Sequence, residues 1–285
     1  MIISVASGKG GTGKTTVAVN LALSLNNVQL LDCDVEEPNS HIFIKPLFKR
    51  RDPVFVPIPV VDQKKCDGCG RCKEVCAYNA IAITSKKVLI FPELCHGCGS
   101  CTYFCPNDAL REENEEIGVL EIGRKDGIEF IHGKLNIGKM AAPPVIRAVK
   151  KRISREKTVI IDVPPGTSCP VITAIRDTDF VILVTEPTPF GLNDLSLAVE
   201  VARKLEIPFG VVINRSGLGN KETDKYCQKE DIPILMRIPF SKKIAEIYSR
   251  GGSIVKSLPE YKEKFQILFK EIEKIVSGSN KAGSN

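Results

Sequence analysis

The stretch GKGGTGKT, residues 8–15, most constrains what this chain can fold into. It matches G-x-x-x-x-G-K-[ST] and lies between an apolar run, IISVA, and a segment with a helical pattern over residues 14–25. Glycines let successive backbone N–H groups point at phosphate oxygens, and the N-terminus of the helix adds partial positive charge. The stretch therefore predicts a strand–loop–helix unit that binds a nucleoside triphosphate. Lys14 would reach the β- and γ-phosphates, and the Thr15 hydroxyl would bind Mg²⁺.

Acidic residues follow two further apolar runs. Asp32 and Asp34 end the run LLDCD, and Asp162 ends TVIID. Because the carboxyl ends of parallel strands face one crevice, we expect these carboxylates to lie near the phosphate loop. There they can hold Mg²⁺ and its waters, and one of them can orient an attacking water. An incidental glycine-rich turn, the alternative to a phosphate loop, would not require these partners.

The rest of the chain alternates apolar runs of strand length with helical patterns. This alternation predicts an α/β fold with a mainly parallel sheet that is covered on both faces. The expected strands are residues 2–6, 28–32, 158–162, 180–185, 209–214 and 234–238. The stretch IGVLEIGRKDGIEFI differs, because two short runs around a Lys-Asp-Gly turn predict a β-hairpin.

One segment interrupts this alternation and contains an internal repeat. CDGCGRCKEVCAYNAI, from residue 66, recurs as CHGCGSCTYFCPNDAL from residue 95, and together the two copies hold eight of the eleven cysteines. A duplication inside a larger α/β unit indicates an inserted module, which at ~50 residues needs a metal to stabilise it. We therefore expect a discontinuous domain of residues 1–61 and 112–276, an inserted module of residues 62–111, and a disordered tail of residues 277–285.

Each copy of the repeat has the spacing C-x2-C-x2-C-x3-C. This is the spacing of small α+β bacterial ferredoxins, in which the fourth cysteine of each run ligates the other cluster. Two [4Fe–4S] clusters are therefore predicted, with two sets of ligands: Cys66, Cys69, Cys72 and Cys105; Cys76, Cys95, Cys98 and Cys101. Zinc is the alternative, although zinc sites usually pair two separated C-x2-C knuckles. His96 either tunes the neighbouring cluster or is an exposed bystander.

Composition limits the partners and the compartment. The N-terminus has no basic region before its first strand and no apolar run reaches ~20 residues, so we expect a cytoplasmic protein without a membrane partner. In a reducing compartment, eleven cysteines indicate metal rather than disulfides. The basic runs KPLFKRR and KKRISREK are interpreted as solvated faces or loops, so no nucleic acid is expected. The apolar face of the last helical segment, residues 260–276, is expected to dock on the sheet rather than on a membrane.

The motifs GKGGTGKTT, DCDVEEPN, DVPPGTS and VVINR together resemble the deviant Walker-A ATPases, which include MinD, ParA, Mrp-type cluster carriers and the nitrogenase iron protein. Within this group, the chain is most similar to MinD-like P-loop ATPases with an inserted ferredoxin domain. The resemblance implies ATP and Mg²⁺ as ligands and a homodimer that sandwiches ATP. It assigns nucleotide binding to Gly8, Lys9, Gly10, Gly11, Thr12, Gly13, Lys14, Thr15 and Thr16.

The resemblance also implies individual roles. Lys9 would reach the phosphates of the partner subunit, as an arginine finger does. Asp34 would position the hydrolytic water, and Asp32, Asp162 and Thr15 would lie at the Mg²⁺ shell. Gly166 would offer its N–H to the γ-phosphate. Adenine would be recognised by Asn214 and the segment around Pro239.

Three cysteines lie outside the repeat. Cys169 falls where the nitrogenase iron protein carries a ligand of its bridging cluster, but the place of the second ligand here holds Met140, so a bridging cluster of that kind is not expected. Cys169 is a redox thiol, a transient ligand or a buried small residue. Cys33 is expected in the core, and Cys227 stands without the C-x-x-C of the Mrp-type carriers.

These features lead to one hypothesis and two alternatives. The hypothesis is an ATPase whose nucleotide-driven dimer switch is coupled to electron transfer through two clusters to a redox partner protein. The first alternative is an ATP-dependent carrier that delivers iron–sulfur clusters to acceptor proteins. The second is a positioning ATPase in which the clusters are only structural.

Overall fold

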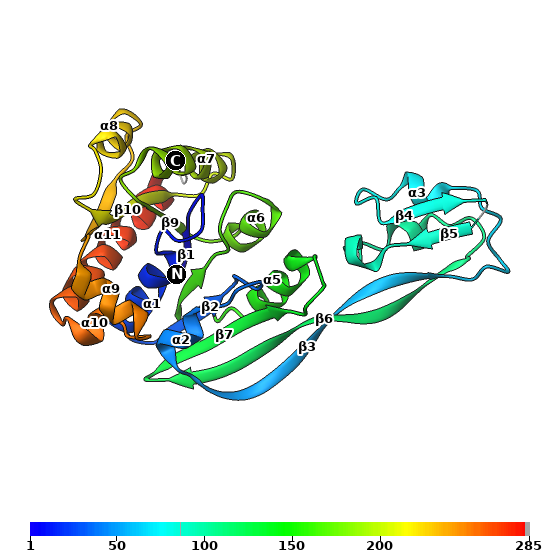
Figure 1. The fold of residues 1–285 in the computed structure, drawn as a ribbon, viewed down its shortest axis with the longest axis horizontal. Helices are drawn as coiled ribbons and strands as arrows, with labels where there is room; N and C mark the ends of the chain where they lie inside the picture. The colour runs from blue at the N-terminus through cyan, green and yellow to red at the C-terminus, as the bar shows by residue number, and fades with distance from the viewer. Residues whose placement is uncertain (86, 283–285) are drawn as a thin grey trace.

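The computed structural model describes residues 1–85 and 87–282. Within these residues nine strands form one sheet, drawn in Figure 1. From one edge to the other the strands are β11 (Ile234–Pro239), β10 (Phe209–Ser216), β9 (Phe180–Thr185), β1 (Ile2–Ala6), β8 (Thr158–Asp162), β2 (Val28–Asp32), β7 (Ile128–Leu135), β6 (Leu110–Lys125) and β3 (Leu47–Val61). Neighbours from β11 to β7 pair in parallel, whereas β7, β6 and β3 pair antiparallel. The predicted mainly parallel sheet and the predicted hairpin, which is β6 and β7, are both confirmed.

Helices cover both faces of the sheet, because alternate strand residues point to opposite faces. On β8, Val159 and Ile161 belong to one buried cluster and Ile160 to the other. The first face is covered by α5 (Ala142–Lys150), α6 (Cys169–Ile175), α7 (Pro189–Lys204) and α8 (Glu222–Lys229). The second is covered by α1 (Lys14–Ser24), α2 (Ser40–Ile44), α10 (Ile254–Ser257) and α11 (Glu260–Ala282), with α9 (Lys242–Ser249) beside them.

Helix α11 docks on this second face, as predicted. Phe265, Leu268 and Ile272 are buried against α1 and the sheet, and each such side chain contributes about 1.5–3 kcal/mol. The tail differs from the expectation, since α11 continues to Ala282 where disorder was expected from residue 277. Extending an existing helix costs far less than starting one, so the polar residues after Val276 continue it. Residues 283–285 of the expected tail lie outside the described residues.

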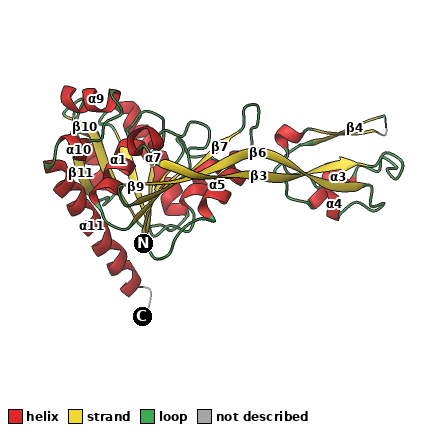
Figure 2. Cartoon of the chain, turned by 90° about the horizontal axis from the view of Figure 1, so that it is seen from below, coloured by secondary structure: helices red, strands yellow, loops and turns green. Residues whose placement is uncertain are grey.

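The long strands β3 and β6 form a two-stranded ribbon that leaves the body of the molecule (Figures 1 and 2). Their pairing runs from Leu47 opposite Arg124 to Val61 opposite Leu110. The sequence did not reveal β3, because its prolines and charged residues are typical of loops. An edge strand tolerates them, since one of its sides needs no ladder hydrogen bonds. The basic run KPLFKRR is largely exposed at the start of this strand.

The cysteine-rich segment sits at the far end of the ribbon. It contains α3 (Arg71–Glu74), the antiparallel pair β4 (Ile81–Thr84) and β5 (Lys87–Ile90), the short 3-10 helix η1 (Pro92–Leu94) and α4 (Ser100–Tyr103). Its buried cluster is small and consists of Cys72, Ile81, Val88, Cys101 and Leu110. Two of these five residues are predicted cluster ligands, so the apolar core alone is thin, as expected for a unit that a metal stabilises.

Candidate functional site

The phosphate loop connects β1 to α1, as the sequence predicts. Gly13 precedes the helix with φ +99°, a conformation that favours glycine. A Cβ at Gly13 would also lie 2.3 Å from Asn214 Nδ2, so the loop and the end of β10 are packed without room for a side chain. The Asn214 side chain donates to the Thr12 carbonyl at 2.8 Å. This contact fixes the start of α1, where the backbone N–H groups face any bound anion.

A cavity of about 1260 Å³ opens beside this loop. Nine of the residues predicted to bind nucleotide or to act on it line the cavity: Gly10, Gly11, Gly13, Lys14, Thr15, Thr16, Asp34, Asn214 and Pro239. The others do not line it: Gly8, Lys9, Thr12, Asp32, Asp162 and Gly166. The sequence reasoning missed Glu37, Asn39, Arg215, Phe240 and Tyr248, which also line the cavity. Phe240 directly follows Pro239, so an aromatic residue at that position was the available signal.

Three carboxylates surround Lys14 beside the cavity, and of the three only Asp34 lines it. Asp32 and Asp162 are direct neighbours on the parallel strands β2 and β8, and both are buried. Burial, and then the charge of Asp162, raise the pKa of Asp32 well above its usual value and that of Asp34 to about 6. Burial lowers the pKa of Lys14, although the three carboxylates oppose this effect. The group therefore has an excess of acidic side chains around one cation.

Ser40 ties the two buried carboxylates together. Its hydroxyl donates to Asp162 Oδ2 at 2.9 Å, and its backbone N–H donates to Asp32 Oδ2 at 3.0 Å. Asp32 Oδ1 accepts from the Asp34 N–H at 3.1 Å, so both oxygens of Asp32 are engaged. Asp162 Oδ1 is buried without a partner among the described residues. An orphaned carboxylate oxygen near the Thr15 hydroxyl fits a hydrated Mg²⁺, which takes few protein ligands. Asp32 instead holds the loop that carries Asp34.

Three of the predicted nucleotide-binding residues have partners within the chain. Lys9 Nζ lies 3.9 Å from Asp194 Oδ2, outside the cavity of its own chain. The Gly166 N–H donates to the Ser7 carbonyl at 3.1 Å, so a contact with a γ-phosphate requires this bond to break. Asn214 donates one amide hydrogen to the Thr12 carbonyl, and its Oδ1 accepts from the Arg215 N–H at 2.9 Å, which leaves one amide hydrogen and one lone pair for adenine.

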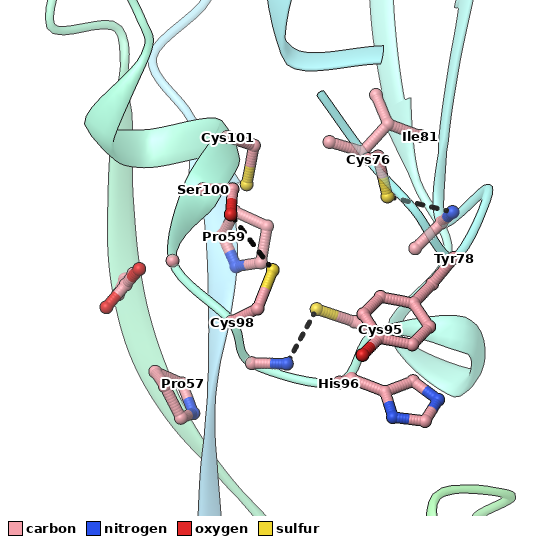
Figure 3. Close-up of a pocket in the computed structure, with 14 residues that line it drawn as sticks. Pro57, Pro59, Cys76, Tyr78, Ile81, Cys95, His96, Cys98, Ser100 and Cys101 are labelled. Carbon is pink, nitrogen blue, oxygen red and sulfur yellow. Dashed lines mark hydrogen bonds between the residues drawn. The ribbon is translucent and has the colours of Figure 1, made fainter. Parts of the chain in front are cut away.

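The eight cysteines of the repeat form two separate groups, each lining its own cavity. Cys76, Cys95, Cys98 and Cys101 line a cavity of about 390 Å³, together with Pro57, Pro59 and Glu112 of the ribbon (Figure 3). We call it the body-side cavity. Cys66, Cys69, Cys72 and Cys105 line another of about 330 Å³, which meets the ribbon at its far end, at Val61 and Leu110. We call it the tip cavity. These are the two ligand sets expected from the spacing, including the exchange of the fourth cysteine.

The two groups of cysteines are held in similar ways. Cys76 Sγ accepts from the Ala80 N–H at 3.4 Å and Cys105 Sγ from the Ala109 N–H at 3.3 Å. Within the described chain, no group of three or more His, Cys, Asp or Glu side chains could hold a single metal ion. The four thiols around each cavity match in number and kind the donor set of a [4Fe–4S] cluster.

The remaining cysteines differ in exposure. Cys33 is in the core, as expected, and Cys227 is also buried, which raises the pKa of its thiol to about 11. Cys169 is exposed at the start of α6, so the interpretation as a buried small residue is wrong.

The described helices include none that is long and apolar enough to cross a membrane.

The profile of the CobQ/CobB/MinD/ParA nucleotide-binding domain, CbiA, matches residues 3–254. An uncharacterized protein of Methanocaldococcus jannaschii is 33% identical over 263 residues, which cover 90% of this chain and 92% of that protein. An iron–sulfur cluster carrier protein of Pyrococcus horikoshii is 29% identical over 303 residues, covering 95% of this chain and 87% of the carrier.

Solved structures share the fold at lower identity. The cell division ATPase MinD of Pyrococcus furiosus superposes with a TM-score of 0.60 at 23% identity, covering 96% of this chain and 98% of MinD. The septum site-determining protein MinD of Pyrococcus horikoshii, complexed with Mg-ADP, gives a TM-score of 0.58 at 22% identity and 96% coverage of both chains. The phosphate loop, the carboxylates and the family profile agree: the chain belongs to the CobQ/CobB/MinD/ParA family of nucleotide-binding domains.

Proposed function

We propose that this chain is an ATPase that couples a nucleotide-driven dimer switch to electron transfer through two [4Fe–4S] clusters. The observation that carries the proposal is the division of eight cysteines into two four-cysteine cavities on a ribbon that continues the sheet of a nucleotide-binding domain. The phosphate loop and the cysteine-rich segment are thus connected to strands of one sheet, which supports coupling between them.

In the nucleotide site, the chain would bind the phosphates through the loop N–H groups and Lys14. Mg²⁺ would be held by Thr15 and Asp162, with Asp32 fixing the adjacent loop. Asp34, whose pKa is about 6, would be ionised at neutral pH and would orient the attacking water. Lys9, which lies outside its own cavity, would supply charge to the site of a second copy.

In the module, the cysteine thiolates would hold the clusters, which supply one-electron chemistry. Each cavity offers four cysteines from one chain, which favours retention of the clusters over delivery. The partner would be a redox protein that docks near the module. The eleven cysteines are all free thiols in this structure, so we place the protein in a reducing compartment, the cytoplasm.

A second candidate is an ATP-dependent cluster carrier. It is favoured by the relatives, because that of Pyrococcus horikoshii is described as an iron–sulfur cluster carrier and one of Anopheles gambiae as a cytosolic Fe–S cluster assembly factor. The Anopheles protein is 26% identical over 283 residues. The carrier candidate predicts that the clusters leave the chain when an acceptor protein is present.

Retention of iron separates these two functions. The holoprotein would be loaded anaerobically with ⁵⁷Fe, mixed with MgATP and an apo-ferredoxin, and separated again. Label that stays on the chain supports electron transfer, whereas MgATP-dependent movement of label to the acceptor supports a carrier. Iron, sulfide and zinc analysis of the starting material is the control, with about eight iron and eight sulfide per chain expected for two cubanes.

A further inference from the structure

The two cluster cavities have different surroundings, although the repeat makes their cysteines equivalent. The body-side cavity has a wall made by the ribbon, from Pro57 and Pro59 of β3 and Glu112 of β6. Pro59 lies opposite Glu112 in the ladder, two residues nearer the body than Val61, which lies opposite Leu110 and lines the tip cavity. The body-side cavity is therefore the one that the ATPase domain can reach through its strands.

Glycines of the two repeat copies show the same asymmetry. A Cβ at Gly97 (φ +62°) would lie 2.4 Å from Val56 Cγ1 and 2.9 Å from Pro57 Cδ, so the second cysteine loop rests directly on β3. A Cβ at Gly99 would lie 3.2 Å from Glu112 Oε1. Its counterpart in the first copy, Gly70, faces only Ile83 Cδ1 of the module itself, at 3.7 Å. At this position the first copy of the repeat contacts the module and not the ribbon.

A second connection joins helix α5 to the ribbon beside the body-side cavity. Val145 and Ile146 of α5 belong to the same buried cluster as Val56 of β3, and Cys95 packs against this cluster. Tyr78 and His96, which line the cavity, stack with ring centroids 3.8 Å apart and an angle of 9° between the ring planes (Figure 3).

The start of α5 touches the nucleotide site. Ala142 and Ile146 line a cavity of about 750 Å³ together with Asp34 and Glu37. Asp34 and Glu37 also line the nucleotide cavity. Val35, the residue after Asp34, belongs to the same buried cluster as Ala142 and Ile146, so the loop that carries Asp34 packs against α5.

We propose that the cluster in the body-side cavity is the nucleotide-sensing cluster, tuned by Glu112 and linked to the phosphate site through α5, while the cluster in the tip cavity keeps its properties in every nucleotide state. This inference rests on the proposed coupling of ATP to electron transfer and names the cluster through which it acts.

A substitution of Glu112 can identify which of the two measured reduction potentials belongs to the body-side cluster. No ion pair to its carboxylate exists within the described residues, and it stands at the cavity wall. A negative charge beside a cluster opposes the addition of an electron, so Glu112→Gln raises the reduction potential of that cluster. Glu113→Gln is the matched control, because Glu113 is paired with Arg111 at 2.7 Å and does not line the cavity.

The test is a potentiometric titration of the anaerobic holoprotein, followed by EPR, with and without MgATP. Glu112→Gln should raise one of the two potentials and Glu113→Gln neither, which identifies the body-side cluster. MgATP should then shift the potential of that same cluster in the unsubstituted chain. A shift confined to the other cluster, or equal in both, overturns this inference and leaves the coupling intact. No shift in either cluster overturns both.

Discussion

Lys14 lies among three carboxylates in a part of the nucleotide cavity from which water is largely excluded. Its side chain is only 6% exposed, and its ammonium group lies 3.5 Å from the Lys9 carbonyl. Burial lowers the pKa of Lys14, because the charged ammonium group is less stable away from water. The negative charges of Asp162, Asp34 and Asp32 stabilise it and so oppose this effect. In this position the Lys14 ammonium group can bind a phosphate group without first losing a full hydration shell.

Replacing Lys14 tests the nucleotide half alone. Lys14→Ala should lower ATP turnover by at least about a hundredfold, because one preorganised positive group at the phosphates is lost. The visible absorbance of the clusters should stay, since the cysteine cavities lie at the other end of the ribbon. Phosphate release is the measurement for turnover. Turnover that survives in Lys14→Ala would exclude this loop as the catalytic site.

Asp34 should show opposite effects on activity and stability. Its pKa is raised to about 6, so the folded chain binds a proton more tightly than the unfolded chain does. Stability is therefore lost as the pH rises from about 4 through about 6, and at neutral pH the ionised carboxylate is a destabilising group. Asp34→Asn should abolish turnover and yet stabilise the chain above pH 6 by on the order of 1 kcal/mol, after a discount for solvent screening.

The matched measurements are phosphate release and thermal unfolding of Asp34→Asn over a pH series. In the unsubstituted chain, turnover should rise with pH through about 6, as the carboxylate ionises. The gain in melting temperature from Asp34→Asn should shrink as the pH falls toward 4. A substitution that destabilises the chain at neutral pH would show that the carboxylate is stabilised by partners in the folded state.

The sequence predicted which side chains lie near one another in the nucleotide site, but not all of their hydrogen bonds. The spacing of GKGGTGKT and the residues that end strands place Lys14, Thr15 and Asp162 close together, because both signals are local. The sequence could not show that Asp32 uses both oxygens on the N–H groups of Asp34 and Ser40. Those bonds depend on how the chain turns after β2, and no pattern specifies that turn.

At the scale of elements, the buried parallel strands could be predicted and the ribbon could not. β8 and β9 have the predicted bounds because each is a short apolar run that is buried on both faces. β3 carries three prolines and four charged residues and is stabilised by its pairing with β6, which is distant in the sequence. Lys150 belongs to a basic run that was expected to be solvated. Its ammonium group instead donates to the carbonyl of Thr173 in α6 at 3.0 Å.

The contact of the second cysteine loop with the ribbon gives a prediction at this scale. Gly97→Ala and Gly70→Ala both place a Cβ at positive φ, which costs about 1–3 kcal/mol. Only the Cβ at residue 97 also collides with β3. Gly97→Ala should therefore bind less iron than Gly70→Ala, measured as iron per chain after anaerobic reconstitution. Equal iron contents would show that the loop is not held by the ribbon.

At the scale of the whole molecule, the nucleotide cavity and the cysteine cavities lie in different parts of the chain, and strands of one sheet connect them. The nucleotide cavity is lined by residues that follow the central strands β1 and β2, and the cysteine cavities are lined by residues of the segment between β3 and β6. Figures 1 and 2 show this segment at the far end of the ribbon. The repeat spacing predicted the two cysteine groups. Their distance from the ATPase body was not predictable, because it depends on the length of a ribbon whose first strand has no sequence signal.

Lys9 makes the dimer testable by complementation. Lys9→Ala and Lys14→Ala should each be inactive alone, because every site then lacks one of its two lysines. In an equimolar mixture, half of the dimers are mixed and hold one complete site, so up to about a quarter of unsubstituted turnover should return. Turnover that stays absent on mixing would mean that Lys9 serves its own chain.

The most direct test of the whole account is the EPR spectrum of the dithionite-reduced protein, recorded anaerobically with and without MgATP. Lys14→Ala, recorded in the same way, is the control for nucleotide binding. The account predicts signals of reduced [4Fe–4S] clusters that change on addition of MgATP in the unsubstituted chain and stay constant in Lys14→Ala. Cluster signals that are identical with and without MgATP, in protein shown to bind ATP, would contradict it.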